Sequence, residues 1–538
     1  MLTKEIQTDN QLIQNFYIIG LNSNYIFSDN LYKEPLSKNI EPNVISKFPK
    51  LSYSYNNIPD SLILKHCFPT GFFPIEITEN KKNTTCNFIF TLDNILFNNI
   101  NKNKFEKIYF TCFEFYESLF DYGILYKKKL DLINKNNNEL EINDNLKKIF
   151  IPKIICIASV LPFPNEFSKI LSSIYQKYIF EKAKVNYPLE KLIENLVMKI
   201  PIPLYGQFIN YINFNEKIIL FRNPINKIQN NSIELSLLFT YFNIENILKI
   251  LKCILLEIPL LFFSKDKYKL TNIVEGLLSL IFPFNYIYPF ISILPSNCYS
   301  IIETFKSYIL GINEEYDIRF FKNNNLEIDE KSIIIVDIDK SNINVIEPQS
   351  NEMQSILLED LGNEKKKNND NSLFSNIEFP SHYKKKIINS LSSYIKKVNN
   401  IKEEKNTFNY SIRDKILYFI TSIIIDYATF IKYDQFNLKV FDSKFYSKKH
   451  GSIKIESIFK IDDYIYQFSK EDQSFYERFL RTKLFLNFII NKIYPKTYED
   501  KLKILFFDEK ITSKKNKKFF TKNIKTIFLN SDFSIKNN

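Results

Sequence analysis

One stretch of this chain, residues 235–311, constrains the fold more than any other. Apolar residues recur at helical spacing over residues 244–255, and a continuous apolar run at 260–263 follows directly. A run of this length and composition is typical of a buried parallel strand. A second helical pattern covers residues 274–281, and residues 290–294 form the next predicted strand. Because helices alternate with buried strands, the sequence predicts an α/β layer built from βαβ units.

Length, composition and charge limit the number of domains and the kinds of partner that this chain can have. A chain of 538 residues is too long for one core and predicts about two to four domains. Hydrophobic residues make up 45% of the chain, which indicates a globular protein. The formal net charge of +12 is compatible with contact to acidic surfaces, including anionic membranes. Because the basic residues are spread out and no recognition motif is present, we expect no nucleic-acid partner.

Metal and targeting patterns are missing from the sequence. The six cysteines stand singly, without a C-x-x-C pair, and the three histidines are not spaced as metal ligands. We therefore expect buried free thiols and no metal site. Residues 1–10 are polar and lack the apolar core of a signal peptide, which predicts a reduced, cytoplasmic protein. The apolar stretches 277–294 and 416–431 are interrupted or short, so we expect buried elements there rather than membrane spans.

The sequence also lacks the motifs of covalent catalysis. Neither a P-loop nor a G-x-G-x-x-G or G-x-S-x-G motif occurs. We therefore predict no catalytic residue and no cofactor. A protein of this kind acts through binding surfaces, which a sequence locates less sharply than a catalytic triad.

Residues 235–311 resemble the central part of the DENN domain family. The matching positions are Glu257, Leu260, Leu261, Ser264, Glu275, Leu278, Pro283, Phe284, Leu294, Pro295, Tyr308 and Gly311. The chain departs from the pattern at Tyr286, where the family usually has Trp, and at Ser292, where it usually has Pro.

The flanking sequence resembles the other two parts of that family, in the right order. Upstream, strands are predicted at 16–20, 88–91 and 107–113, and a strand at 154–159 resembles the opening of the central part. Downstream, helices are predicted at 377–397, 412–431 and 475–489. The matching flanking residues are Phe88, Phe90, Thr91, Tyr109, Cys112, Phe115, Glu117, Phe475, Phe479, Thr482, Phe485, Phe488 and Ile489.

This resemblance implies a tripartite organisation. A longin-like α/β lobe is expected at 10–126, a central α/β layer with a mostly parallel sheet at 150–340, and an α-helical downstream part at 375–495. Polar stretches at 127–149 and 341–374 are predicted linkers. Residues 496–538 are a predicted basic tail.

The resemblance also implies a function. DENN proteins promote nucleotide exchange on Rab GTPases, so we expect a guanine nucleotide exchange factor in vesicle trafficking, cytoplasmic and peripheral on endomembranes. Its partner would be a Rab-family GTPase. The alternative is a non-catalytic DENN scaffold or a Rab-binding adaptor in a larger complex.

Two groups of residues are candidate contact sites. Glu257, Ser264 and Glu275 are predicted partner-binding residues, and the alternative for each is helix capping or loop anchoring. Near the C-terminus, Lys514, Lys515, Lys517 and Lys518 precede two phenylalanines. They are a predicted contact to an anionic membrane surface, with a solvated tail as the alternative.

Overall fold

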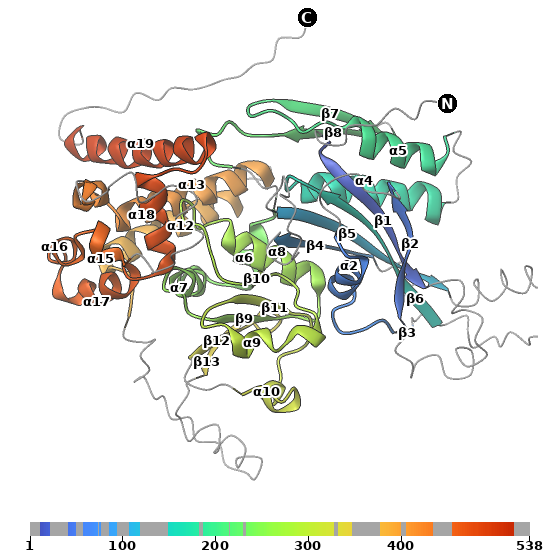
Figure 1. Ribbon diagram of the computed structural model, residues 1–538, viewed down its shortest axis with the longest axis horizontal. Helices are drawn as coiled ribbons and strands as arrows, with labels where there is room; N and C mark the ends of the chain where they lie inside the picture. Colours follow the sequence, from blue (N-terminus) through green and yellow to red (C-terminus); the bar gives the residue numbers. More distant parts are fainter. Residues whose placement is uncertain are drawn as a thin grey trace, which may run out of the picture.

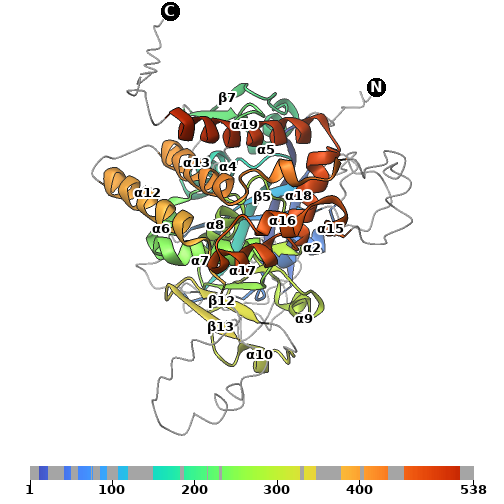
Figure 2. The ribbon, with the colours of Figure 1, turned by 90° about the vertical axis from the view of Figure 1, so that its left-hand side faces the viewer.

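The chain folds into an upstream α/β lobe, a central α/β layer and a helical downstream part in this computed structural model (Figure 1). The described residues are 11–21, 41–49, 58–73, 75–76, 85–93, 107–118, 149–181, 187–214, 216–229, 233–327, 332–346, 377–399, 405–433 and 454–520. The predicted linkers 127–149 and 341–374 lie outside these residues, except that residue 149 begins strand β6 (Ile149–Ser159) and residues 341–346 include strand β13 (Asn342–Ile346). Seen end-on, the helical part lies in front of the two sheets (Figure 2).

The upstream lobe is an antiparallel sheet in the order β2-β1-β6-β5-β4, with β3 paired to β6. Its elements are β1 (Ile13–Leu21), β2 (Pro42–Phe48), α2 (Asp60–Cys67), β3 (Ile75–Glu76), β4 (Cys86–Asp93), β5 (Lys107–Ser118), β6 (Ile149–Ser159), α4 (Pro164–Ile174), the π-helix η6 (Tyr175–Phe180), α5 (Leu189–Lys199), β7 (Phe208–Asn213) and β8 (Glu216–Phe221). The strand predicted at 154–159 is part of β6, so it pairs with upstream strands rather than with the central sheet.

The central layer is a five-stranded sheet in the order β10-β11-β9-β12-β13, parallel except for the edge strand β13. Its elements are α6 (Ser236–Tyr241), α7 (Ile244–Leu255), β9 (Leu260–Phe263), α8 (Lys267–Leu278), β10 (Phe290–Ile291), η7 (Ser296–Cys298), α9 (Ile301–Thr304), β11 (Ile309–Ile312), α10 (Phe320–Asn323), β12 (Ile333–Asp337) and β13 (Asn342–Ile346). The predicted α/β layer is confirmed, because β9 is fully buried between parallel neighbours.

Strand β10 is shorter than the predicted strand at 290–294. The chain leaves the ladder after Ile291, although Leu294 N still donates to the Gly311 carbonyl at 2.7 Å. A Cβ at Gly311 would lie 2.1 Å from the Ser292 carbonyl oxygen. This close approach of two backbones requires glycine at position 311.

The downstream part is helical, as predicted. Its elements are α12 (Ser381–Asn399), α13 (Lys405–Ile423), η8 (Tyr427–Phe430), α15 (Ile455–Ile458), α16 (Ile461–Ile465), α17 (Lys470–Phe479), α18 (Lys483–Ile493) and α19 (Tyr498–Phe520). The single helix predicted at 475–489 is wrong: Thr482 divides it, because its Oγ1 accepts from Phe485 N at 3.2 Å and caps α18. The helix predicted at 412–431 ends at Ile423, before Asp426 takes a left-handed conformation with φ 65°.

Candidate functional site

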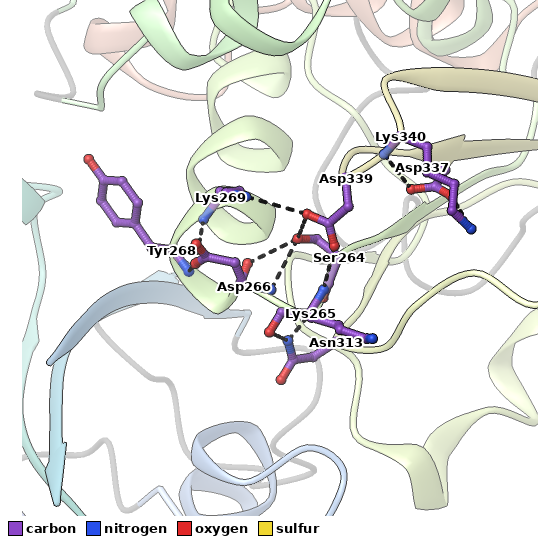
Figure 3. Close-up of polar contacts among 9 residues, drawn as sticks. All are labelled: Ser264, Lys265, Asp266, Tyr268, Lys269, Asn313, Asp337, Asp339 and Lys340. Carbon is purple, nitrogen blue, oxygen red and sulfur yellow. Dashed lines mark hydrogen bonds and ion pairs between the residues drawn. The ribbon is translucent and has the colours of Figure 1, made fainter. Parts of the chain in front are cut away.

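Three loops of the central layer meet at the carboxyl ends of its parallel strands (Figure 3). Ser264 and Lys265 follow β9, Asn313 follows β11, and Asp339 follows β12. Ligand and partner sites of open α/β sheets occur at this edge, because the loops there leave the sheet in different directions. We call these loops the strand-end loops.

Hydrogen bonds hold the strand-end loops in one arrangement (Figure 3). The Ser264 hydroxyl donates to Asp339 Oδ1 at 3.0 Å, and Lys265 N donates to Asp339 Oδ2 at 2.9 Å. Asn313 Nδ2 donates to the carbonyls of Ser264 and Lys265, each at 3.0 Å. Asp266 then begins α8, since its Oδ1 accepts from Tyr268 N at 2.9 Å. The loops are therefore preorganised.

Charged side chains cover the outer surface of these loops. Glu315 lies between two lysines, 2.6 Å from Lys265 Nζ and 3.4 Å from Lys340 Nζ. Hydrogen bonds from Lys265 and Lys340 hold the pKa of Glu315 below its usual value. All three side chains are more than half exposed, so this cluster is available to a binding partner.

A groove of about 700 Å³ separates the strand-end loops from the upstream lobe. On one wall lie Lys265, Asp266 and Asn313, and on the other lie Phe73 and Tyr116 with their neighbours. Phe73 is 40% exposed, so it offers apolar surface to a molecule bound in the groove. We call this cavity the strand-end groove.

Lys267 joins the two walls at the floor of the strand-end groove. Its Nζ donates to Glu114 Oε2 of β5 at 2.8 Å and to the Cys67 carbonyl at the end of α2 at 3.0 Å. Burial lowers the pKa of Lys267, but the charge of Glu114 outweighs burial and leaves that pKa above its usual value. The ammonium therefore stays charged and pins the two lobes together.

Helix α8 continues this contact along the edge of the upstream sheet. One turn beyond Lys267, Thr271 Oγ1 accepts from Ile89 N of the edge strand β4 at 3.2 Å. After a further turn, Glu275 Oε1 accepts from the Thr91 hydroxyl at 3.0 Å. Positions 267, 271 and 275 share one helix face, so a single helix fastens the lobes. A second groove, of about 730 Å³, opens near Glu275.

Each predicted partner-binding residue has an internal partner. Glu275 binds the upstream lobe, and Ser264 binds Asp339 within the strand-end loops. Glu257 binds the downstream part: its Oε1 accepts from Leu484 N in the first turn of α18 at 2.7 Å. The three residues are far apart in the fold and anchor different segments. Direct contact of any of them with another protein stays a prediction.

Glu257 has a constrained backbone and a shifted pKa. It follows α7 with φ 56°, the left-handed conformation of a helix C-terminus, and Ile258 N donates to the Cys253 carbonyl at 2.9 Å. Burial raises the pKa of Glu257, while hydrogen bonds from Leu484 N and the Tyr288 hydroxyl act in the opposite direction. The carboxyl is thus fixed against the downstream helices rather than held out to solvent.

The structure describes the side chain of one of the four predicted membrane lysines. Lys514 is 5% exposed, because it lies between α19 and α13, where its Nζ donates to the Tyr418 carbonyl at 3.0 Å and to the Ser422 hydroxyl. Its ammonium therefore does not lie on the surface. Lys515, Lys517 and Lys518 continue α19, and their side chains are outside the described residues.

Sequence reasoning missed Lys267 and Asp339 as site residues. Asp339 has a sequence signal, since it closely follows the apolar strand β12 in the pattern Val-Asp-Ile-Asp. Lys267 carries none, because its partner Glu114 is 153 positions away in the chain.

The described residues contain no group of three or more His, Cys, Asp or Glu side chains placed to hold a metal ion. Across the same ranges, no helix has both the length and the apolar character needed to cross a bilayer. Burial raises the pKa of the Cys67 and Cys112 thiols, which keeps them protonated. What the site offers chemically is a preorganised, charged and partly apolar binding surface.

Comparison with known proteins gives a family for the middle of the chain. Residues 150–341 match the model of the DENN (AEX-3) domain. A DENN domain-containing protein of Schizosaccharomyces pombe (strain 972 / ATCC 24843) is 27% identical over 157 residues. That alignment covers 29% of this chain and 16% of the relative, so the similarity concerns a domain rather than the whole protein.

Proposed function

Because this is a DENN domain protein, with the domain in residues 150–341, we propose that it promotes GDP release from a Rab-family GTPase in vesicle trafficking. An exchange factor binds the nucleotide-free GTPase more tightly than the loaded one, and this differential affinity accelerates release. The reaction requires a shaped surface and no covalent catalyst.

The strand-end groove carries the proposal. It lies between two lobes that α8 holds in a fixed relation, so a GTPase bound there would touch both walls. Lys265 offers charge on one wall and Phe73 offers an apolar contact on the other. Glu315 and Lys340 continue the charged surface on the outer side of the strand-end loops. A preorganised surface loses little conformational entropy on binding. It can therefore bind one state of the GTPase more tightly than the other.

We also propose the tripartite division of the sequence, with an upstream part at 10–126, a central part at 150–340, a downstream part at 375–495 and a basic tail at 496–538. The lobes of the fold do not follow the first boundary, because β6, α4 and α5 of the central part pack in the upstream lobe. The antiparallel order β2-β1-β6-β5-β4 with flanking helices supports a longin-like upstream lobe.

Peripheral attachment to endomembranes belongs to the same proposal. Lys515, Lys517 and Lys518 would add on the order of 1 kcal/mol each near an anionic surface. A truncation that tests this should end after Lys514, because removing Lys514 also breaks the contact with α13.

The decisive experiment is release of fluorescent GDP across a panel of Rab proteins. We expect accelerated release from at least one of them. Replacing Lys265 and Lys340 together by Ala should reduce the acceleration about tenfold, which corresponds to about 1.4 kcal/mol. The control Lys470→Ala, at an exposed site on α17, should leave it unchanged.

Two other outcomes would overturn the exchange proposal. Binding of a Rab without faster release would favour the adaptor or scaffold. Failure to bind any Rab in the panel would remove the support for both functions.

A further inference from the structure

The hairpin β7–β8 is apolar on both of its faces. Its inner face packs against α4, where Ile218 and Leu220 are buried. On its outer face, Phe208 lies directly opposite Phe221, and both are exposed, by 59% and 43%. A hairpin with one face in solvent normally alternates apolar inside with polar outside. The outward phenylalanines therefore indicate a surface that something covers.

More apolar side chains continue this outer face. Ile219 lies beside Phe221 on the same face of β8, and Ile212 lies opposite Lys217 near the turn. Ile219 is 48% exposed and Ile212 is 71% exposed. Because residues of one strand that are two positions apart share a face, the four apolar side chains form one patch.

Helix α19 extends the patch beside the hairpin. The Tyr205 and Glu499 side chains interact at the first turn of α19, where Glu499 acts to raise the pKa of Tyr205. The Arg222 guanidinium stacks 3.5 Å from the centre of the Tyr205 ring. Further along α19, the side chains of Tyr498 and Leu505 are 73% and 44% exposed. Figures 1 and 2 both show α19 and β7 along the same side of the molecule.

We propose that this surface, the hairpin face, rests on an anionic lipid bilayer. It is made of Phe208, Ile212, Ile219, Phe221, Tyr498 and Leu505. The apolar side chains enter the interfacial region of the bilayer, and Lys217 and Lys501, both exposed, contact lipid head groups.

Charge selects the bilayer over a second copy of the chain. The net charge of +12 favours contact with anionic lipid over contact with a second, equally charged copy. Lysines among phenylalanine, tyrosine and aliphatic side chains are also the composition of interfacial membrane surfaces. Bilayer contact by the hairpin face does not require exchange activity. A failed exchange assay would therefore not contradict the bilayer proposal, and a failed vesicle assay would not contradict the exchange proposal.

The absence of tryptophan in the chain permits a direct test. Phe208→Trp places a single tryptophan on the hairpin face, and Tyr466→Trp places one at a control position that is 80% exposed, directly after α16. Vesicles of phosphatidylcholine with about 30 mol% phosphatidylserine should shift the Phe208→Trp emission to the blue. Brominated lipid should quench it, and the Tyr466→Trp emission should not change. An unshifted Phe208→Trp spectrum would overturn the proposal.

A second measurement separates bilayer contact from other causes. The double variant Phe208→Ser and Phe221→Ser should bind the same vesicles at least tenfold more weakly, about 1.4 kcal/mol, with an unchanged circular dichroism spectrum. Equal sedimentation of this variant and the native chain would contradict the proposal. So would a Phe208→Trp shift that appears without vesicles, rises with protein concentration and accompanies a dimeric mass.

Discussion

The central layer meets its two neighbours through junctions of different chemistry. Toward the upstream lobe, α8 uses an ion pair and hydrogen bonds from Lys267, Thr271 and Glu275. Toward the helical part, Phe284 packs edge-on against Phe479 and Phe488, with ring centres 5.6 and 5.3 Å apart. Polar contacts also cross this junction, including the Lys252–Glu378 ion pair and the hydrogen bond from Leu484 N to Glu257, but among the described residues aromatic packing is found there and not at α8. Ion pairs and hydrogen bonds are directional, so the upstream junction fixes the orientation of the lobes. Ring packing contributes mainly burial free energy, so the aromatic contacts of the downstream junction supply stability.

The largest effect should come from the aromatic junction. Phe284 is 4% exposed, so Phe284→Ala leaves a cavity and should lower the free energy of unfolding by about 4 kcal/mol. Urea unfolding followed by circular dichroism measures it. Tyr466→Ala, at an exposed site, should cost less than about 0.5 kcal/mol. A cost below about 1 kcal/mol for Phe284→Ala would contradict the assignment of stability to this junction.

The second largest loss of stability should come from breaking the Lys267–Glu114 ion pair of the upstream junction. Lys267→Met leaves Glu114, whose side chain is 6% exposed, without its cation, at a cost of about 3 kcal/mol. Adding Glu114→Gln should recover at least half of that loss, because the buried charge is then gone. A double-mutant cycle from unfolding curves gives the coupling. If the two losses simply add, Lys267 and Glu114 do not act as a pair.

Acid should destabilise the upstream lobe through His66. Burial lowers the pKa of His66 to about 4, so the unfolded chain binds its proton first. The stability from neutral His66 is present above its usual pKa and is lost as the pH falls toward about 4. The native chain should lose about 2 kcal/mol between about pH 7.5 and pH 5 that His66→Asn does not lose. Parallel pH profiles for the two chains would refute this.

Glu257 at the downstream junction should titrate in the opposite direction, with the smallest effect. Because burial raises its pKa, the stability from the protonated carboxyl is present below about 4.5 and is lost as the pH rises through the folded-state pKa. Glu257→Gln keeps one of two acceptor contacts and should cost about 1 kcal/mol near pH 4 and less near pH 7. Urea unfolding of both chains at the two pH values measures this cost. A cost that is larger near pH 7 than near pH 4 would contradict the prediction.

The α/β layer was predictable because its strands are short apolar runs. Leu260–Phe263 is buried on both faces, and such a strand is apolar at every position. The break at Thr482 was not predictable from periodicity. Apolar side chains continue on both sides of the break, and the Thr482 hydroxyl and the Glu257 carboxylate accept from the first amides of the second helix.

The candidate site was less accessible to sequence reasoning than the fold. Glu257, Ser264 and Glu275 stand out in the family pattern, yet their partners are a backbone amide, an aspartate and a threonine from distant segments. A sequence identifies a polar residue at the end of an element. Which surface that residue meets depends on how whole lobes dock, and spacing along the chain does not encode this.

The covered edge of the upstream sheet protects the protein from aggregation. Strand β4 is the last strand of its sheet, and α8 occupies the side where another strand would pair. If α8 came away, the amide of Ile89 and its neighbours would become a template for pairing with a strand of another molecule. Partial unfolding at this junction therefore leads toward aggregation, and substitutions in α8 that spare the strand-end groove should still reduce the soluble yield of the protein.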